Sequence, residues 1–328
     1  MALTVKQLIA DLKAGKYAPV YLLTGEENYF IDQVSDYMEE HIVASEFQDF
    51  DKTVLYGRDV DMKTVVATAQ RYPMMSPYQL VLIKEAQELP SRDKAWDFLA
   101  TYLQHPQMQT ILVFCYRHKK LDKRSKAYKA INDKGVVFET KKMYETDLYR
   151  WIGLSVKEHG YSIPEKSAML LAEYLGNDLG KINNELSKLY IALPKGSLLG
   201  GDAIEQYVGI SKDYNVFELQ SALSRRDIEK SNRIINNFAA NPKENPIQLV
   251  LPMLYSYFIK VMIFIQDPST ASSYMMKDYS AAAQNYTLPK LAKVIGYLYE
   301  ADLRAKGVHN NTTSDGEILK EMVFKIIH

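Results

Sequence analysis

The sequence predicts an α/β domain followed by an all-helical remainder of the chain. In the first part, short apolar runs alternate with helical patterns, which is typical of a parallel sheet covered on both faces. From Glu145 onward the strand patterns fade, and apolar residues recur at helical spacing. The 328 residues are enough for two or three domains that each bury a core.

The strand predictions rest on four runs that are short, apolar and rich in β-branched residues. The predicted strands are residues 19–24, 79–83, 110–115 and 135–139, and the clearest helices between them are residues 30–42 and 95–103. The only cysteine, Cys115, ends the third run. We therefore expect a buried structural residue there, not a reactive thiol.

The helical part is predicted from cap residues and breaks. A capping Thr146 and a closing Gly160 bound its first helix. The further helices are expected at residues 163–176, 179–189, 217–223 and 247–265, the last with a proline near its start. A break is expected near Gly209, and residues 267–273 form the clearest loop of this region. No internal repeat is visible.

Composition places the protein in the cytoplasm, with no membrane partner. The 40 Lys and Arg balance 40 Asp and Glu, so no overall field favours nucleic acid. The first residues have no secretory pattern, and we expect no apolar run that approaches the roughly 20 residues needed to span a bilayer.

Residues 21–30, YLLTGEENYF, resemble the strand-to-helix turn of a phosphate-binding loop, but the chemistry is missing. Such a loop needs several glycines, a lysine for the outer phosphates and a Ser or Thr for Mg²⁺. The turn offers Gly25 alone, followed by Glu26, Glu27 and Asn28, whose two carboxylates would repel an anion from the helix N-terminus. The pattern predicts a nucleotide-binding scaffold without nucleotide chemistry, and therefore an interaction protein.

Five segments in this order carry a more specific resemblance. They are residues 21–27, 72–83, 120–126, 176–189 and 301–307. Together they resemble the delta subunit of the bacterial DNA polymerase III clamp loader, and the resemblance covers essentially the whole chain.

The resemblance implies three domains and a set of partners. It implies an AAA+-like Rossmann-type domain over residues 1–142, a small helical lid over residues 143–210 and a helical collar over residues 211–328. The expected function is to bind the sliding clamp and hold its ring open for loading on primed DNA during replication. The collar is expected to join the gamma/tau and delta-prime type subunits of the loader.

The resemblance also implies a non-catalytic subunit with no cofactor, no metal and no catalytic residue. The Ser-Arg-Cys element by which neighbouring subunits complete each other's ATP sites is absent, since Cys115 follows Phe114. Two alternatives remain open: an ATP-hydrolysing AAA+ motor subunit, which residues 25–28 argue against, and a helical adaptor with no role in replication.

By position in the family, Pro73, Met74 and Met75 are the expected clamp-binding residues. Unbranched, polarizable Met side chains suit a pocket on another protein, and a desolvated apolar anchor contributes strongly to interface energy. The alternative is that Met74 and Met75 cap the core beneath the following strand.

The basic run at residues 117–129 has seven Lys and Arg against one Asp. Such a run can neutralise phosphates, which makes Lys119, Lys120, Lys123, Arg124 and Lys126 candidates to face DNA. The alternative is a solvated amphipathic helix with Leu121, Arg124, Tyr128 and Ile131 on one stripe.

Other groupings indicate no chemistry. The paired carboxylates Glu26–Glu27 and Asp49–Asp51 are interpreted as solvated surface. The six His lack metal-binding spacing, and most of the 24 Tyr are interpreted as packing residues.

Overall fold

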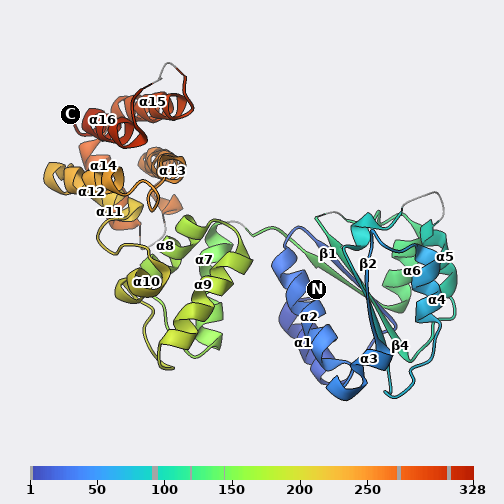
Figure 1. The fold of residues 1–328 in the computed structure, drawn as a ribbon. Coiled ribbons are helices and arrows are strands. Elements are labelled where there is room, and N and C mark those ends of the chain that lie inside the picture. The colour runs from blue at the N-terminus through green and yellow to red at the C-terminus, as the bar shows by residue number, and fades with distance from the viewer. Residues whose placement is uncertain (1–2, 91–94, 119, 144, 272–274, 309–311) are drawn as a thin grey trace. The chain divides into compact units, whose positions relative to one another are not determined.

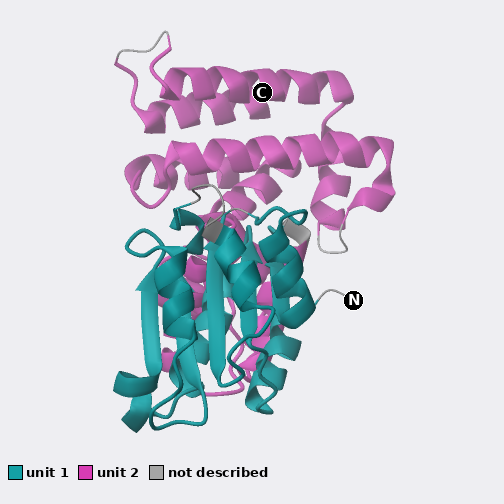
Figure 2. Ribbon diagram, turned by 90° about the vertical axis from the view of Figure 1, so that its right-hand side faces the viewer, with its two compact units in different colours: residues 1–143 teal, residues 144–328 magenta. Residues whose placement is uncertain are grey.

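A computed structural model describes residues 3–90, 95–118, 120–143, 145–271, 275–308 and 312–328. The chain divides into two compact units, residues 1–143 and 144–328, which are coloured separately in Figure 2. Each unit is described by itself. The division of the second unit into a lid and a collar near residue 210 stays a prediction.

The first unit is a five-stranded sheet between two layers of helices (Figure 1). The strands are β1 (Val20–Gly25), β2 (Lys52–Tyr56), β3 (Gln79–Lys84), β4 (Thr110–Arg117) and β5 (Val136–Thr140). They are ordered β2-β3-β4-β1-β5, and every pair of neighbours is parallel. The predicted α/β class with a parallel sheet is confirmed.

Helices cover both faces of this sheet, which explains why its central strands are buried along most of their length and mainly apolar. The helices are α1 (Val5–Lys13), α2 (Asn28–His41), α3 (Gln48–Asp51), α4 (Met62–Ala69), α5 (Ala95–Tyr102) and α6 (Lys126–Lys134). Leu22 and Phe114 pack on one face with residues of α4, α5 and α6, whereas Leu23 and Val113 pack on the other with residues of α1 and α2.

Cys115 lies on β4 and is 1% exposed, as predicted for a structural cysteine. Burial raises the pKa of its thiol to about 12. The thiol is therefore protonated at neutral pH and is not a nucleophile.

The second unit is built mainly of helices, as predicted, with an isolated bridge between Ser162 and Leu198. Its helices are α7 (Glu145–Glu158), α8 (Glu165–Leu175), α9 (Leu179–Ala192), α10 (Gly201–Val208), α11 (Val216–Ser224), α12 (Ile228–Ala240), α13 (Ile247–Gln266), α14 (Met276–Asn285), α15 (Leu288–Ala305) and α16 (Asp315–Ile327). A 3-10 turn, Pro268–Thr270, lies within the predicted loop, of which residues 272–273 are outside the described residues.

The expectation that no apolar run approaches 20 residues was wrong. Helix α13 has 20 residues and is long and apolar enough to cross a membrane by length and composition. Pro252 and Lys260 interrupt the run without ending the helix. Half of its apolar window is buried within the second unit, where α13 packs against α11, α14 and α15. A core helix passes the same test, so α13 is weak evidence for a membrane span.

Candidate functional site

The turn between β1 and α2 is closed by the chain's own hydrogen bonds. The amide of Glu26 donates to the Thr140 carbonyl at 3.4 Å, and the amide of Glu27 donates to Thr140 Oγ1 at 3.1 Å. The Tyr29 amide donates to the carboxylate of Glu27 at 3.3 Å, which makes Glu27 the N-cap of α2. The amides of Glu26, Glu27 and Tyr29 are therefore already bonded within the chain and do not converge on a phosphate site.

Gly25 is required by the packing of this turn. Its φ is +133°, and a Cβ atom built there would lie 2.1 Å from the Thr140 carbonyl oxygen. Gly25 thus allows β1 and β5 to approach closely, which is a structural role. Asn28 completes the turn, and its Nδ2 lies 2.9 Å from Nε2 of His118.

Pro73, Met74 and Met75 lie in the loop between α4 and β3. Met74 is 74% exposed and Met75 is 59% exposed, while Pro73 is half-buried. The alternative that both Met residues cap the core is therefore wrong. Tyr72, just before them, is also exposed.

Asp51 holds this loop from beneath, and its interpretation as solvated surface was wrong. The side chain is 3% exposed at the end of α3. Its Oδ1 accepts a hydrogen bond from the Met74 amide at 2.5 Å. Its Oδ2 accepts from the amides of Met75 and Ser76 at 2.8 and 2.6 Å. By contrast, Asp49 on the same helix is exposed, as expected.

A second group of buried polar side chains fixes both ends of the loop. Gln79 Nε2, at the start of β3, donates to Thr110 Oγ1 at 2.6 Å and to the carbonyl of Arg71. Thr110 Oγ1 in turn donates to the Ala69 carbonyl at 2.8 Å, where α4 ends. Because buried polar groups are costly to leave unpaired, these bonds restrict the loop to one path.

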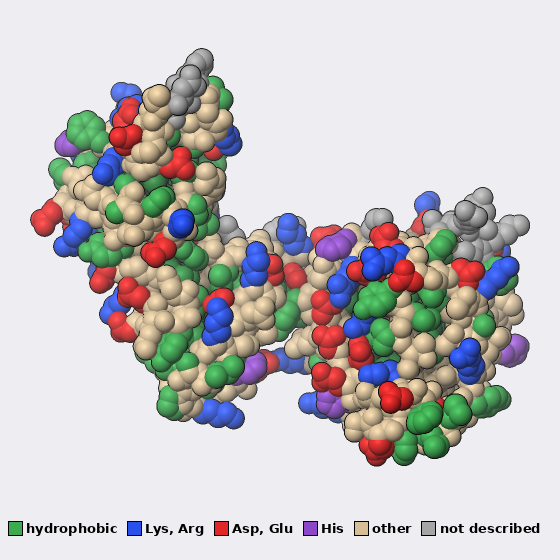
Figure 3. Space-filling view, viewed as in Figure 1, with side chains coloured by type: hydrophobic (Ala, Val, Ile, Leu, Met, Phe, Trp, Pro, Cys, Tyr) green, Lys and Arg blue, Asp and Glu red, His purple; other side chains and the backbone are tan. Residues whose placement is uncertain are grey.

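Further exposed apolar side chains precede the neighbouring strands. Phe50 comes two residues before β2, and Met108 comes two residues before β4. Since the starts of parallel strands meet at one edge of a sheet, these side chains lie at the same edge as Met74. Figure 3 shows hydrophobic side chains gathered at the lower end of the first unit, where these strands begin. Sequence reasoning missed Phe50 and Met108, because each is flanked directly by polar residues on both sides.

The cations of the basic run are largely paired within the chain. Lys120 and Lys123 lie 2.8 and 2.9 Å from the carboxylate of Glu139. Their hydrogen bonds, that of Lys120 being the larger cause, hold the pKa of Glu139 below its usual value. These pairs reduce the positive charge that the run presents to solvent.

Two of the remaining candidate cations also lie beside carboxylates. Arg124 pairs with Asp122 at 3.1 Å, and Lys126 lies 3.7 Å from Asp97. Lys119 lies outside the described residues. The geometry brings these cations beside carboxylates and does not by itself assign them to DNA.

The alternative interpretation, one amphipathic helix that includes Leu121, Arg124, Tyr128 and Ile131, was also wrong, because the observed helix is shorter. Helix α6 begins at Lys126, because Ser125 caps it by accepting the Tyr128 amide at 3.1 Å. Leu121 and Arg124 precede the helix, and Arg124 is exposed. The Asp122 carboxylate accepts the Arg124 amide at 2.9 Å, which favours a turn there.

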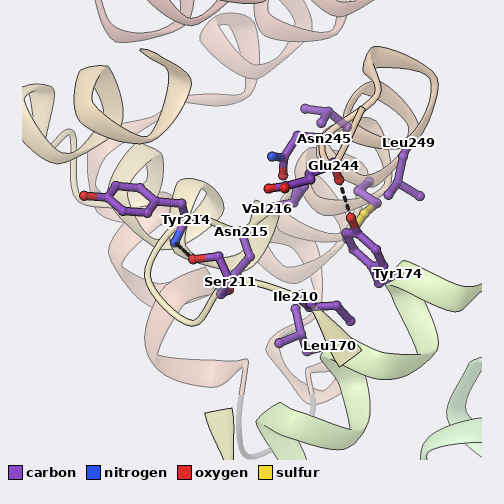
Figure 4. Close-up of a pocket in the computed structure, with 13 residues that line it drawn as sticks. Leu170, Tyr174, Ile210, Ser211, Tyr214, Asn215, Val216, Glu244, Asn245 and Leu249 are labelled. Atoms are coloured by element: carbon purple, nitrogen blue, oxygen red, sulfur yellow. Dashed lines mark hydrogen bonds between the residues drawn. The ribbon is translucent and has the colours of Figure 1, made fainter. Parts of the chain in front are cut away.

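The second unit contains a small hollow between α8, the segment before α11 and the segment before α13 (Figure 4). Figure 4 shows Tyr174 pointing toward Glu244, whose carbonyl oxygen accepts a hydrogen bond from the Tyr174 hydroxyl. On the far side, the Tyr214 amide donates to Ser211 Oγ at 3.2 Å. Apolar side chains such as Leu170 line much of the rest. The hollow lies where the lid and the collar are predicted to meet, and its lining suggests packing, not catalysis.

No group of three or more His, Cys, Asp or Glu side chains in the described part of the chain could hold a metal ion. The described residues therefore offer two features of functional interest. One is a phosphate-loop-like turn closed on itself, and the other is an anchored loop with exposed apolar side chains.

Comparison with known proteins connects these features to one family. A family model described as DNA polymerase III, delta subunit, matches residues 21–141. DNA polymerase III subunit delta of Bacillus subtilis (strain 168) is 25% identical over 246 residues, which are 73% of this chain and 71% of that protein. The solved structure of the Bacillus subtilis DNA clamp loader delta protein has a TM-score of 0.59 and 20% identity, with 99% of both chains covered. That structure has the same fold along the whole chain, so the resemblance of this chain to the delta subunits of the DNA polymerase III clamp loader is confirmed.

Proposed function

We propose that this chain is a clamp-loader delta subunit that binds the sliding clamp through Pro73, Met74 and Met75 and holds its ring open for loading on primed DNA. The observation that carries the proposal is the anchored loop. Two adjacent Met side chains are largely exposed, although the backbone beneath them is bonded to a buried carboxylate. An apolar side chain held in water by a rigid loop favours burial in a partner's pocket.

Ring opening follows from differential binding. If the loop binds the clamp better when one ring interface is open, attachment shifts the clamp toward its open form. The shift cannot exceed the subunit's preference for that form. The work of opening then requires no chemistry in this chain.

We propose further that the subunit does not hydrolyse ATP. The amides of Glu26 and Glu27 are bonded to Thr140, and no lysine stands in the turn. ATP would act in the gamma/tau type subunits and control when Met74 and its neighbours are accessible. Residues 211–328 would join this chain to those subunits and to the delta-prime type subunit, with residues 143–210 as a lid between. Primed DNA would bind the assembled complex in the cytoplasm.

The test is the affinity of the whole chain for the sliding clamp. The double substitution Met74→Ser with Met75→Ser removes two apolar anchors. Burial of each Met side chain in the clamp would contribute roughly 1.5–3 kcal/mol to binding. We expect clamp affinity to fall about 100-fold or more. The melting temperature should stay within about 2 °C of the unchanged protein, because exposed residues contribute little to folding.

The matched control is Met276→Ser, an exposed Met on α14 in the second unit. It should leave clamp affinity unchanged. Clamp affinity that survives the double substitution would overturn the assignment of this loop.

A further inference from the structure

We propose that Asp51 is the positioning residue of the clamp-binding loop: its buried carboxylate holds Met74 and Met75 in the conformation that a partner binds. The inference rests on the proposed function, because it concerns how the same loop is presented. Asp51 does not touch the partner in this account. It acts through the backbone of the residues that do.

The geometry is that of a carboxylate used as an anchor for successive amides. Both oxygens are engaged, with Oδ1 bonded to Met74 N at 2.5 Å and Oδ2 to Met75 N and Ser76 N at 2.8 and 2.6 Å. Three neighbouring peptide groups are thereby fixed relative to one point. The side chains of Met74 and Met75 are left to project outward.

The carboxylate is also the ionised form. Burial raises the pKa of Asp51, but the hydrogen bonds from the amides of Met74, Met75 and Ser76 outweigh that effect and bring the pKa below its usual value. An ionised carboxylate only accepts hydrogen bonds, and bonds to a charged acceptor are roughly twice as strong as neutral ones. The anchor is therefore in its strongest state at neutral pH.

The position of Asp51 in the chain ties the loop to the rigid sheet. Asp51 immediately precedes β2, and β2 pairs with β3, the strand that the loop enters. The loop is thus held at two points, by Asp51 directly before β2 and by Gln79 at the start of β3. A loop fixed in this way loses little conformational entropy on binding, so it binds more tightly than a mobile loop with the same side chains.

A purely structural role for Asp51 is the competing explanation. In that case Asp51 stabilises the domain, and any variant that folds should bind the clamp normally. The two explanations differ in the clamp affinity of a variant that is fully folded but lacks the bonds from Asp51 to the loop amides.

Asp51→Asn is the informative variant, because the amide has the same shape but one oxygen becomes a donor. Whichever way the Asn side chain turns, at least one loop amide then faces an N–H group. Asp49→Asn is the matched control, since it removes the same charge from an exposed position on the same helix. We expect folded Asp51→Asn to bind the clamp about tenfold more weakly. Asp49→Asn should bind as the unchanged protein does.

Hydrogen exchange of individual amides, read by NMR, tests whether the substitution loosens the loop while the sheet stays intact, so that a loss of clamp affinity can be traced to the loop. In Asp51→Asn the amides of Met74, Met75 and Ser76 should exchange at least about tenfold faster, while those in the interior of β3 and β4 should not change. Normal clamp affinity in a folded Asp51→Asn protein would overturn the inference, even if its melting temperature is lower.

The proposed function fails separately. If the Met74→Ser, Met75→Ser protein binds the clamp normally, the loop is not the clamp site and the inference falls with it. If that protein binds weakly and Asp51→Asn binds normally, only the positioning role is wrong.

Should Asp51→Asn not fold, the unchanged protein still decides the matter. The three amides belong to residues with exposed or half-buried side chains, yet the inference predicts that they are protected from exchange. Exchange at the rate of an unstructured peptide would contradict it.

Discussion

Two turns of the α/β unit both have their backbone amides bonded within the chain, but they expose side chains of opposite character. After β1, the amides of Glu26 and Glu27 are bonded to Thr140 on the neighbouring strand β5. Before β3, the amides of Met74, Met75 and Ser76 are bonded to Asp51 beside the neighbouring strand β2. In each case an acceptor on or next to the neighbouring strand accepts the amides of the turn and fixes its path.

The two turns differ in the side chains that they leave exposed to solvent. The first turn leaves carboxylates at a helix N-terminus, where an anion would be repelled. The second leaves two apolar side chains in water, where a partner's pocket would be favoured. Bonding the amides of a turn within the chain removes them as ligands for an anion. The exposed side chains then determine what the turn can bind.

The largest expected effect on stability is at Gly25. Gly25→Ala places a Cβ atom 2.1 Å from the Thr140 carbonyl oxygen at a φ of +133°, so the two strands must separate. We expect the free energy of unfolding to fall by about 3 kcal/mol, measured by chemical denaturation. Gly296→Ala, in helix α15 with no atom within 4 Å of the new methyl group, is the control and should not destabilise. Equal stability of the two variants would mean that the first turn is not closed by β5.

A smaller effect is expected from removing the acceptor itself. Thr140→Val keeps the shape of a 4% exposed side chain but leaves the Glu27 amide without its bond at 3.1 Å. We expect a loss of about 1–2 kcal/mol in the free energy of unfolding. Thr53→Val, at a half-buried position on β2, is the control.

Thr140→Val also tests whether the first turn can bind nucleotide once one amide is free. ATP binding, measured by titration, should remain undetectable in Thr140→Val, because freeing one amide supplies neither a lysine nor the missing glycines. Gain of ATP binding would show that Thr140 alone blocks the site.

The smallest effect is expected in the basic run beside the first turn. Lys120→Gln with Lys123→Gln removes two cations that are already paired with Glu139. DNA affinity of the assembled loader should change by less than about twofold, with the same dependence on salt. Lys129→Gln, at an exposed position on α6, gives the matched comparison. A clear loss of salt dependence in the double variant alone would assign these lysines to phosphate.

Much of the fold could be predicted from the sequence because burial leaves a local pattern. The central strands β1, β3 and β4 are buried and mainly apolar, and the predicted bounds of residues 79–83 and 110–115 begin at the same residues as β3 and β4. Strand β2 was missed because its residues are half-buried or exposed and its first two, Lys52 and Thr53, are polar, so its apolar run is very short.

The candidate site was predicted only in part, for a physical reason. The motif at residues 72–76 drew attention to Met74 and Met75, but Asp51 lies 23 to 25 residues away from the amides it binds. Nothing near Asp51 in the sequence distinguishes it from exposed Asp49. A long-range bond between a side chain and backbone amides leaves no periodicity to find.

The central claim is that a domain closed to nucleotide presents an apolar loop to the clamp. The most direct measurement is a calorimetric titration of the whole chain with the sliding clamp, carried out with and without Mg-ATP and repeated with the Met74→Ser, Met75→Ser variant. The account predicts the same clamp affinity with and without ATP, and its loss in the variant. Clamp binding that requires ATP in this chain, or that survives the double substitution, would contradict the account.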